Sequence, residues 1–128
     1  MNRSEMMAAV RSKDTAPELI VRRLVHGMGY RYSLHKANLP GKPDIVLTSR
    51  RKIIFVHGCF WHQHGCGFSH VPKSNAAYWA PKLKRNRERD LEHLRVLRAG
   101  RWKCLVLWEC QLANPERLRS RLQRFLAR

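Results

Sequence analysis

Apolar residues gather in three runs that are typical of β-strands. The runs cover residues 44–47, 52–56 and 102–108, and each follows a turn signal built from Gly, Pro or Arg. Short runs of branched and aromatic residues between such turns predict buried strands. A further short strand is expected around residues 30–33. The sequence therefore predicts four strands, with turns at residues 39–43 and at Arg50-Arg51.

Helical periodicity appears in three other segments. Residues 15–18, Thr-Ala-Pro-Glu, form a capping box that opens a helix ended by Gly27 or Gly29. Asn114-Pro115-Glu116 caps a last helix, whose apolar face carries Leu118, Leu122, Phe125 and Leu126. Between them, Pro81 is expected to start a long basic helix that runs to about Arg98 and is stopped by Gly100. Residues 71–80 are expected to be irregular.

The order of these elements indicates the fold class. Strand, strand, helix, strand, helix favours an α/β fold with a mixed central sheet flanked by helices. A chain of 128 residues is long enough for one domain with its own hydrophobic core. No repeat or low-complexity linker interrupts it, so residues 1–128 are interpreted as a single domain.

Charge narrows the choice of partner. The chain has 26 Lys and Arg residues against 9 Asp and Glu, which gives a formal net charge of +17. Because the basic residues are spread along the chain, they favour a folded surface that binds nucleic acid through its phosphates. The alternative is a ribosomal-type or merely solubilising charge.

Residues 1–11 lack the apolar centre of a secretory signal, and no apolar run reaches the roughly 20 residues of a membrane span. A soluble, cytoplasmic protein without a membrane partner is expected. In a reducing compartment its four cysteines are expected to be thiols or metal ligands rather than disulfides.

Residues 57–66 hold two of the four cysteines and three of the seven histidines, directly after the run 52–56. Zinc bound by Cys and His usually has four protein ligands in structural sites. One possible set is local and consists of Cys59, His62, His64 and Cys66. A competing set replaces His62 by a distant cysteine and releases His62 for catalysis. Of the distant cysteines, Cys104 is mid-strand and Cys110 follows the strand end.

Two carboxylates stand out in this cationic chain. Asp44 heads a strand, where it suits a Mg²⁺ ion bound near a phosphodiester, although a turn-forming Asp is an equal alternative. Asp90 shares a helical stripe with Leu83, Leu91, Leu94 and Leu97, so it is expected to face the core. A buried carboxylate needs a partner. A histidine is one candidate, and an ion pair with Arg87 is the other.

Four sequence blocks, in order, resemble the very-short-patch repair (Vsr) DNA mismatch endonucleases. They are Pro-Gly-Lys-Pro-Asp, Phe-Val-His-Gly-Cys-Phe-Trp-His-Gln-His-Gly-Cys, Lys-x-x-x-Asn-x-x-Arg-Asp and Val-Leu-Trp-Glu-Cys. The resemblance covers nearly the whole chain and implies a restriction-endonuclease-like fold. It also implies nicking of DNA on the 5′ side of the thymine in T·G mismatches left by deamination of 5-methylcytosine. Such a nick would begin very-short-patch repair.

The same resemblance implies roles for individual residues. Asp44 would bind catalytic Mg²⁺, expected as two ions, together with the backbone carbonyl of Val56. Threonine is familiar at the Val56 position, and a carbonyl contact survives the change to valine. His62 would be the catalytic histidine, Asp90 the acid that hydrogen-bonds it, and Glu18 the carboxylate that orients metal-bound water. The superfamily's acid-x-lysine pair is replaced by Val56-His57-Gly58, in keeping with a histidine-centred mechanism. The implied structural zinc ligands are Cys59, His64, Cys66 and Cys110.

The resemblance also implies how DNA is bound. Apolar wedges beside a mismatch unstack and bend the duplex. Phe60, Trp61 and Trp79 would take that role, with Met7 of the DNA-contacting segment 1–14 entering from the other groove; packing over the zinc loop is the alternative. On the basic helix, Lys82, Lys84, Arg85, Arg87 and Arg89 are expected to contact phosphates.

Partners follow from the implied substrate. Double-stranded DNA with a T·G mismatch would be bound by a monomer, in the bacterial cytoplasm and on the nucleoid when DNA is engaged. A DNA cytosine-5 methyltransferase and mismatch-repair proteins would be linked in function. The alternatives are a restriction-type nuclease that cuts paired duplex, a zinc-containing binding module without nuclease activity, and a structural basic protein.

Overall fold

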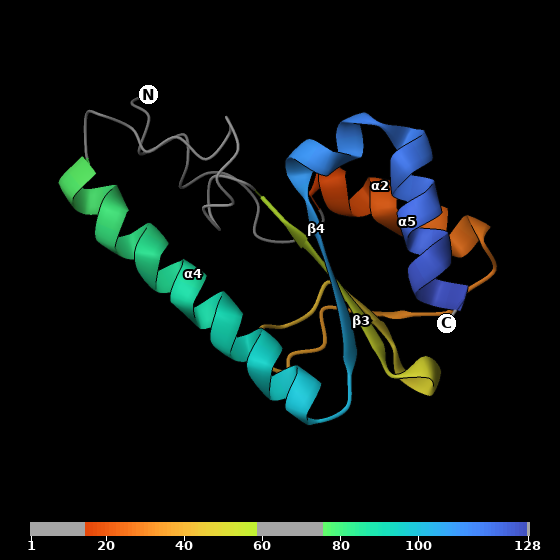
Figure 1. Cartoon of the computed structure of the whole chain (residues 1–128), viewed down its shortest axis with the longest axis horizontal. Helices are drawn as coiled ribbons and strands as arrows, with labels where there is room; N and C mark the ends of the chain where they lie inside the picture. Colours follow the sequence, from red (N-terminus) through yellow and green to blue (C-terminus); the bar gives the residue numbers. More distant parts are fainter. Residues whose placement is uncertain (1–14, 59–75, 128) are drawn as a thin grey trace.

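The computed structural model describes residues 15–58 and 76–127, and these form a mixed sheet between two layers of helix (Figure 1). The elements are α2 (Ala16–Gly27), β1 (Ser33–Leu34), β2 (Ile45–Leu47), the 3-10 helix η1 (Thr48–Arg50), β3 (Lys52–His57), α4 (Ala76–Ala99), β4 (Lys103–Trp108), the 3-10 helix η3 (Glu109–Ala113) and α5 (Pro115–Ala127). Strand order in the sheet is β1-β2-β3-β4. The strands β1, β2 and β3 pair antiparallel, whereas β3 and β4 pair parallel. The predicted mixed α/β architecture is confirmed.

The sheet is covered on both faces, as Figure 1 shows with α4 on one side and α2 and α5 on the other. Alternate residues of β3 supply the two cores. Ile54 and Val56 pack with α2 and α5, whereas Ile53 and Phe55 pack with Leu97 of α4. All six residues of β3 are buried, which explains its unbroken apolar run.

Both predicted helix caps are present. The Thr15 hydroxyl accepts the Glu18 N–H at 3.4 Å, and the Asn114 side chain accepts the Arg117 N–H at 3.2 Å. These side chains satisfy donors that a helix leaves without partners in its first turn. None of the described helices is long and apolar enough to cross a lipid bilayer.

The predicted start of the basic helix is wrong. α4 begins at Ala76, so residues 76–80 are helical rather than irregular, and Pro81 lies inside the helix. A proline there costs helix stability. Trp79 and Leu83, one turn apart, are both buried, and this packing offsets the cost.

The predicted apolar stripe of this helix also needs correction. Leu91 is 60% exposed, whereas Leu83 and Leu97 are buried. Leu91 lies about 80° around the helix from Leu83, but Asp90 and Leu94 lie within about 20° of it. Asp90 and Leu94 are half-buried, so the stripe passes through Asp90 as expected and leaves Leu91 in solvent.

The turn that precedes Asp44 is docked against α4. Gly41 has a φ of +78°, and a Cβ added there would lie 3.0 Å from His93 Nδ1 and 3.2 Å from Phe55 Cε1. Only glycine combines this backbone conformation with so close an approach at low cost. The turn therefore has a fixed position relative to both α4 and β3.

Lys52 is a buried lysine with a structural role. Its side chain is 2% exposed, and its Nζ donates to the carbonyl oxygens of Phe125 at 2.7 Å and Leu126 at 2.9 Å. These carbonyls belong to the last turn of α5, where helix carbonyls lack intrahelical partners and favour a cation. Lys52 thus ties the start of β3 to the end of α5.

We expect Lys52→Ala to lower the free energy of unfolding by about 2–4 kcal/mol, because two buried carbonyls lose their donor and the lysine stem leaves a cavity. Lys103→Ala is the matched control, since Lys103 is the exposed register partner of Lys52 on β4. Urea unfolding of both variants measures the difference. Equal effects would show that the Lys52 contacts contribute little.

Candidate active site

Three side chains from different elements converge where the sheet meets α2. Glu18 comes from α2, His35 follows β1, and Asp44 precedes β2. One ligand atom from each lies within 4.8 Å of the others. The β1–β2 register, which pairs Leu34 with Ile45, brings His35 opposite Asp44, and the His35 N–H donates to the Asp44 carbonyl at 3.4 Å.

The Asp44 carboxylate is held from the side of β3. Its Oδ2 accepts the Val56 N–H at 2.6 Å. Burial raises the pKa of Asp44 from 3.8 to about 7; the Val56 hydrogen bond opposes this rise and the nearby Glu18 carboxylate adds to it. The backbone of Val56 therefore lies beside Asp44, as a shared site would require.

Glu18 is 2% exposed and belongs to the same cluster. Its Oε2 accepts a hydrogen bond from Arg22 Nη2 at 2.9 Å, one helical turn further along α2. The same oxygen lies 3.3 Å from His35 Nε2, and Arg22 Nη2 lies 2.9 Å from that ring nitrogen. The backbone N–H of Glu18 thus takes part in the cap of α2, while its carboxylate lies close to that of Asp44.

Sequence reasoning missed His35 and Arg22. No periodic pattern marks His35, because it follows a strand of only two residues and has a φ of +47°. Its position becomes visible only when β1 is paired with β2. A signal for Arg22 was present, since Glu18 and Arg22 have the i, i+4 spacing of a helical ion pair.

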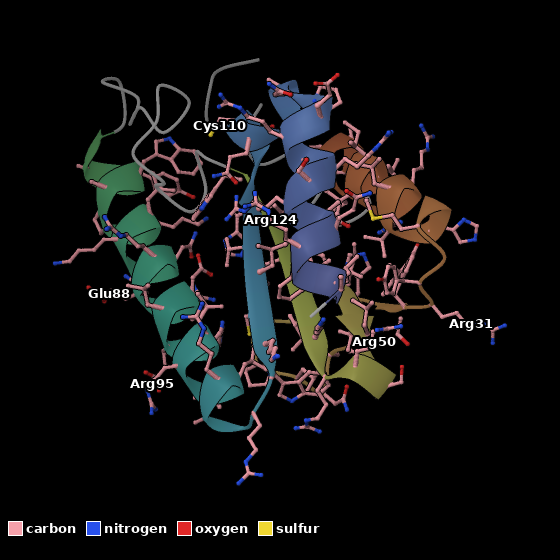
Figure 2. The ribbon with its side chains drawn as sticks, turned by 45° about the vertical axis from the view of Figure 1, so that its right-hand side comes forward. Arg31, Arg50, Glu88, Arg95, Cys110 and Arg124 are labelled. Atoms are coloured by element: carbon pink, nitrogen blue, oxygen red, sulfur yellow. The ribbon has the colours of Figure 1, made fainter. Side chains whose placement is uncertain are left out.

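A second candidate centre lies at the carboxyl ends of β3 and β4. These parallel strands end together, with His57 opposite Trp108. Cys110 follows in η3 at the end of β4 (Figure 2), and Cys59 follows His57 by two residues in the sequence. The Gln111 side chain accepts from the Trp108 N–H at 3.1 Å and from Arg121 Nη1 at 2.7 Å, which fixes η3 against α5.

The two described cysteines differ in position. Cys104 is paired with Ile53, roughly 13 Å from the strand end at 3.3 Å per residue. Burial raises the pKa of the Cys104 thiol, which disfavours the thiolate that a metal needs. Cys110 lies past the strand end, as predicted, and is half-buried. The geometry favours Cys110 over Cys104 as a ligand for a site built from residues 59–66.

His57, at the end of β3, is a buried histidine. Its ring centroid lies 5.3 Å from that of Phe55 and 5.2 Å from that of Trp108, the latter edge-to-face. Aromatic contacts of this kind fix a ring in place. They also join the end of β3 to that of β4.

The outer face of α4 is cationic. All five predicted phosphate-contacting residues are exposed: Lys82, Lys84, Arg85, Arg87 and Arg89. Figure 2 shows Glu88 and Arg95 on the same helix projecting away from the sheet. The exposed side of α4 can therefore meet a phosphate backbone without rearrangement of the core.

Trp79 is placed differently from the expectation. It is 2% exposed and packs edge-to-face on Tyr78, with ring centroids 4.9 Å apart. Such burial favours packing, because an intercalating wedge must be presented to DNA. Intercalation by Trp79 stays a prediction that the described structure does not favour.

Several predicted site residues lie outside the described residues. They are Met7, Cys59, Phe60, Trp61, His62, His64 and Cys66. Their roles stay predictions, as does the pairing of Asp90 with His62.

The donor set at Asp44 and Glu18 fits a Mg²⁺ ion. Mg²⁺ prefers oxygen ligands such as carboxylates, and the carboxylates of Glu18 and Asp44 converge here. Two buried carboxylates this close repel each other, which a divalent cation would relieve.

Comparison with known proteins identifies the chain. The family described as DNA mismatch endonuclease Vsr matches residues 1–67. A relative from Xanthomonas oryzae pv. oryzae, named Type II nicking enzyme V.XorIIP, is 49% identical over 97% of this chain and 91% of its own length. The Neisseria meningitidis Type II nicking enzyme V.NmeAIP is 41% identical over 97% of this chain and 89% of its own. DNA mismatch endonuclease Vsr of Escherichia coli is 40% identical over 91% and 74%.

These matches define the class of protein as DNA endonucleases, which are hydrolases. The chain belongs to the Vsr family of DNA mismatch endonucleases. Its mixed sheet with helices on both faces is consistent with the restriction-endonuclease-like fold that the sequence resemblance implied.

Proposed function

We propose that this protein is a Mg²⁺-dependent, strand-specific endonuclease that nicks DNA 5′ of the thymine in T·G mismatches and so begins very-short-patch repair. The observation that supports it most is the convergence of Glu18, Asp44 and the Val56 backbone in a strongly basic fold. The family membership supports the mismatch substrate. The products would carry a 5′-phosphate and a 3′-hydroxyl.

The chain's own residues have separate tasks in this proposal. Asp44 and the Val56 carbonyl would hold Mg²⁺, expected as two ions. Bound there, Mg²⁺ supplies positive charge that stabilises the extra negative charge of the phosphodiester in the transition state. Glu18 would orient the attacking water. His62, held by Asp90, would accept a proton from that water.

DNA binding would use the outer face of α4 for phosphates and the segments around Met7 and Phe60-Trp61 for the mismatch. The exposed arginines and lysines of α4 support the first part, and binding should weaken as salt rises. A monomer suffices to nick one strand. A cytosine-5 methyltransferase would create the 5-methylcytosine whose deamination yields the substrate.

Two matched duplexes test the function. They carry either T·G or C·G at one position and are incubated with Mg²⁺, without Mg²⁺, and with EDTA. We expect a single nick 5′ of the thymine in the T·G duplex with Mg²⁺, and no product in the other five reactions. Equal cutting of both duplexes would instead indicate a nicking enzyme that recognises paired sequence. Nicking at full rate in EDTA would contradict the metal requirement.

A structural zinc site is a separate part of the proposal, with Cys59, His64, Cys66 and Cys110 as ligands. Cys110→Ser should lower the zinc content from about one ion per chain to a small fraction and reduce thermal stability. Cys104→Ser is the matched control, because Cys104 is also a half-buried free cysteine but lies mid-strand, away from the strand end. Elemental analysis of both purified variants measures zinc. Loss of zinc only in Cys104→Ser would exclude the Cys110 set.

A further inference from the structure

The contact between Arg22 and His35 determines which ring nitrogen of His35 carries a proton. Arg22 Nη2 lies 2.9 Å from His35 Nε2. A guanidinium only donates hydrogen bonds and is always charged, so the ring nitrogen that faces it must accept. A proton on Nε2 would point at the hydrogens of Arg22.

The neighbouring carboxylate fits the same arrangement. Glu18 Oε2 lies 2.9 Å from the same Arg22 nitrogen and 3.3 Å from His35 Nε2. The two N–H groups of Arg22 Nη2 can serve one acceptor each, and the shorter of the two contacts to Nε2 is the one with Arg22. With Nε2 as the acceptor, the N–H group of the ring is at Nδ1.

That proton faces Asp44. His35 Nδ1 lies 4.0 Å from Asp44 Oδ1, while Asp44 Oδ2 accepts from Val56. The separation closes to a hydrogen bond with a shift of about 1 Å, and contacts in catalytic centres often tighten when the substrate binds. Oδ1 of Asp44 would then accept from His35, while Oδ2 accepts from Val56.

The backbone of His35 has a left-handed conformation. Its φ is +47°, in a region that histidine enters more often than most residues do. Such conformations persist where surrounding contacts hold them, and they gather at functional sites. Here the His35 N–H is bonded to the Asp44 carbonyl, so backbone and ring approach the same residue.

We propose that His35 is a positioning residue of the catalytic centre, held by Arg22 with Nε2 as an acceptor and Nδ1–H as a donor, so that it orients the Asp44 carboxylate toward the metal. This inference rests on the proposed role of Asp44 as a metal ligand. It differs from a structural role, because it assigns a donor to Nδ1 and an acceptor to Nε2. Partners that orient a metal ligand typically change metal affinity by about 10-fold to 100-fold when removed.

The tautomer is tested by ¹⁵N NMR of the histidine side chains at about pH 7.5, where a neutral ring gives distinct signals for its two tautomers. The His35 signals are those of the wild-type protein that disappear in His35→Gln. We expect the Nδ1–H pattern, and we expect it to change in Arg22→Gln. A neutral Nε2–H ring, or a doubly protonated one, overturns the proposal.

The effect on the metal is tested with Mn²⁺ alone, without DNA, by titration calorimetry. His35→Leu should weaken Mn²⁺ binding about 10-fold or more, whereas His35→Gln should stay within a few-fold, since an amide also offers one acceptor and one donor. His26→Gln is the control, because His26 is exposed at the end of α2. Equal Mn²⁺ affinity of His35→Leu and wild type overturns the proposal.

Nicking assays separate this inference from the proposed function. On whichever duplex the wild type cuts, His35→Leu should raise the half-saturating Mg²⁺ concentration at least as much as it weakens Mn²⁺ binding, with the KM for DNA unchanged. If the wild type does not prefer the T·G duplex, the proposed function is contradicted. The NMR and Mn²⁺ experiments still test His35, because they use no DNA. A folded His35→Leu variant that nicks T·G duplexes specifically, with the Mg²⁺ requirement of the wild type, would contradict the role of His35 and leave the proposed function intact.

Discussion

Asp44→Asn is expected to abolish nicking, by about 1,000-fold or more, while making the folded protein more stable above pH 7 in the absence of Mg²⁺. The loss of activity follows because an amide cannot supply the negative charge that holds the cation beside the scissile phosphate. The gain in stability follows because a neutral side chain removes the repulsion with Glu18 and the cost of burying a charge.

The sign of the pH dependence follows from the raised pKa of Asp44. Below about pH 4 the carboxyl is protonated in both folded and unfolded chains. Between pH 3.8 and about 7 the unfolded chain releases this proton while the folded one retains it, so stability falls as pH rises and levels off above 7. The full shift corresponds to about 4 kcal/mol at most, and part of it belongs to the pair with Glu18.

Urea unfolding of wild type and Asp44→Asn at about pH 5 and pH 8, without Mg²⁺, measures the contribution of Asp44 together with its coupling to Glu18, because titrating groups that do not interact with Asp44 cancel in the comparison. Glu88→Gln is the control, since it removes an exposed carboxylate of α4. Chelators are left out because they compete for zinc. An asparagine variant that is less stable than wild type at pH 8, or that still nicks, contradicts the assignment.

The second large effect is expected from the two histidines of the ligand-rich segment. His62→Ala should lower nicking by about 1,000-fold, as expected for loss of a general base, and should keep zinc and mismatch binding. His64→Ala should instead lose zinc and thermal stability, because a structural zinc site contributes directly to folding.

Zinc content, thermal melting, duplex binding and single-turnover nicking of both variants give four separate measurements. Ala substitution of the exposed His26 serves as a control for the loss of a histidine. Loss of zinc in His62→Ala would show that Cys59, His62, His64 and Cys66 form an entirely local site. Full activity of a zinc-loaded His62→Ala variant would remove His62 from the mechanism.

Local sequence rules predicted the elements that depend on local interactions. Thr15 and Asn114 satisfy N–H groups a few residues away, and the strands 45–47, 52–57 and 103–108 follow from their apolar runs. Asp44 and Glu18 were predicted by the family resemblance, and the structure places their side chains together. Their roles in catalysis stay predictions.

Features that depend on tertiary contacts were beyond these rules. His35 joins the site through the pairing of β1 with β2, and Lys52 was interpreted only as the start of a strand. Pro81 favours a helix start because proline suits the first turn. The helix instead begins at Ala76, within the segment 71–80 that was expected to be irregular, because Trp79 is buried together with Leu83 one turn later.

The close packing of Gly41 against His93 and Phe55 bears on which phosphodiester bond of the DNA would be cut. The turn that ends in Asp44 is packed directly against the helix that carries the exposed cations. A phosphate held on α4 would therefore lie at a fixed distance from Asp44. In that case the scissile bond would be selected by its distance along the DNA backbone from the phosphate bound on α4. A larger side chain at position 41 would change that spacing, and cleavage would then occur at several neighbouring phosphates.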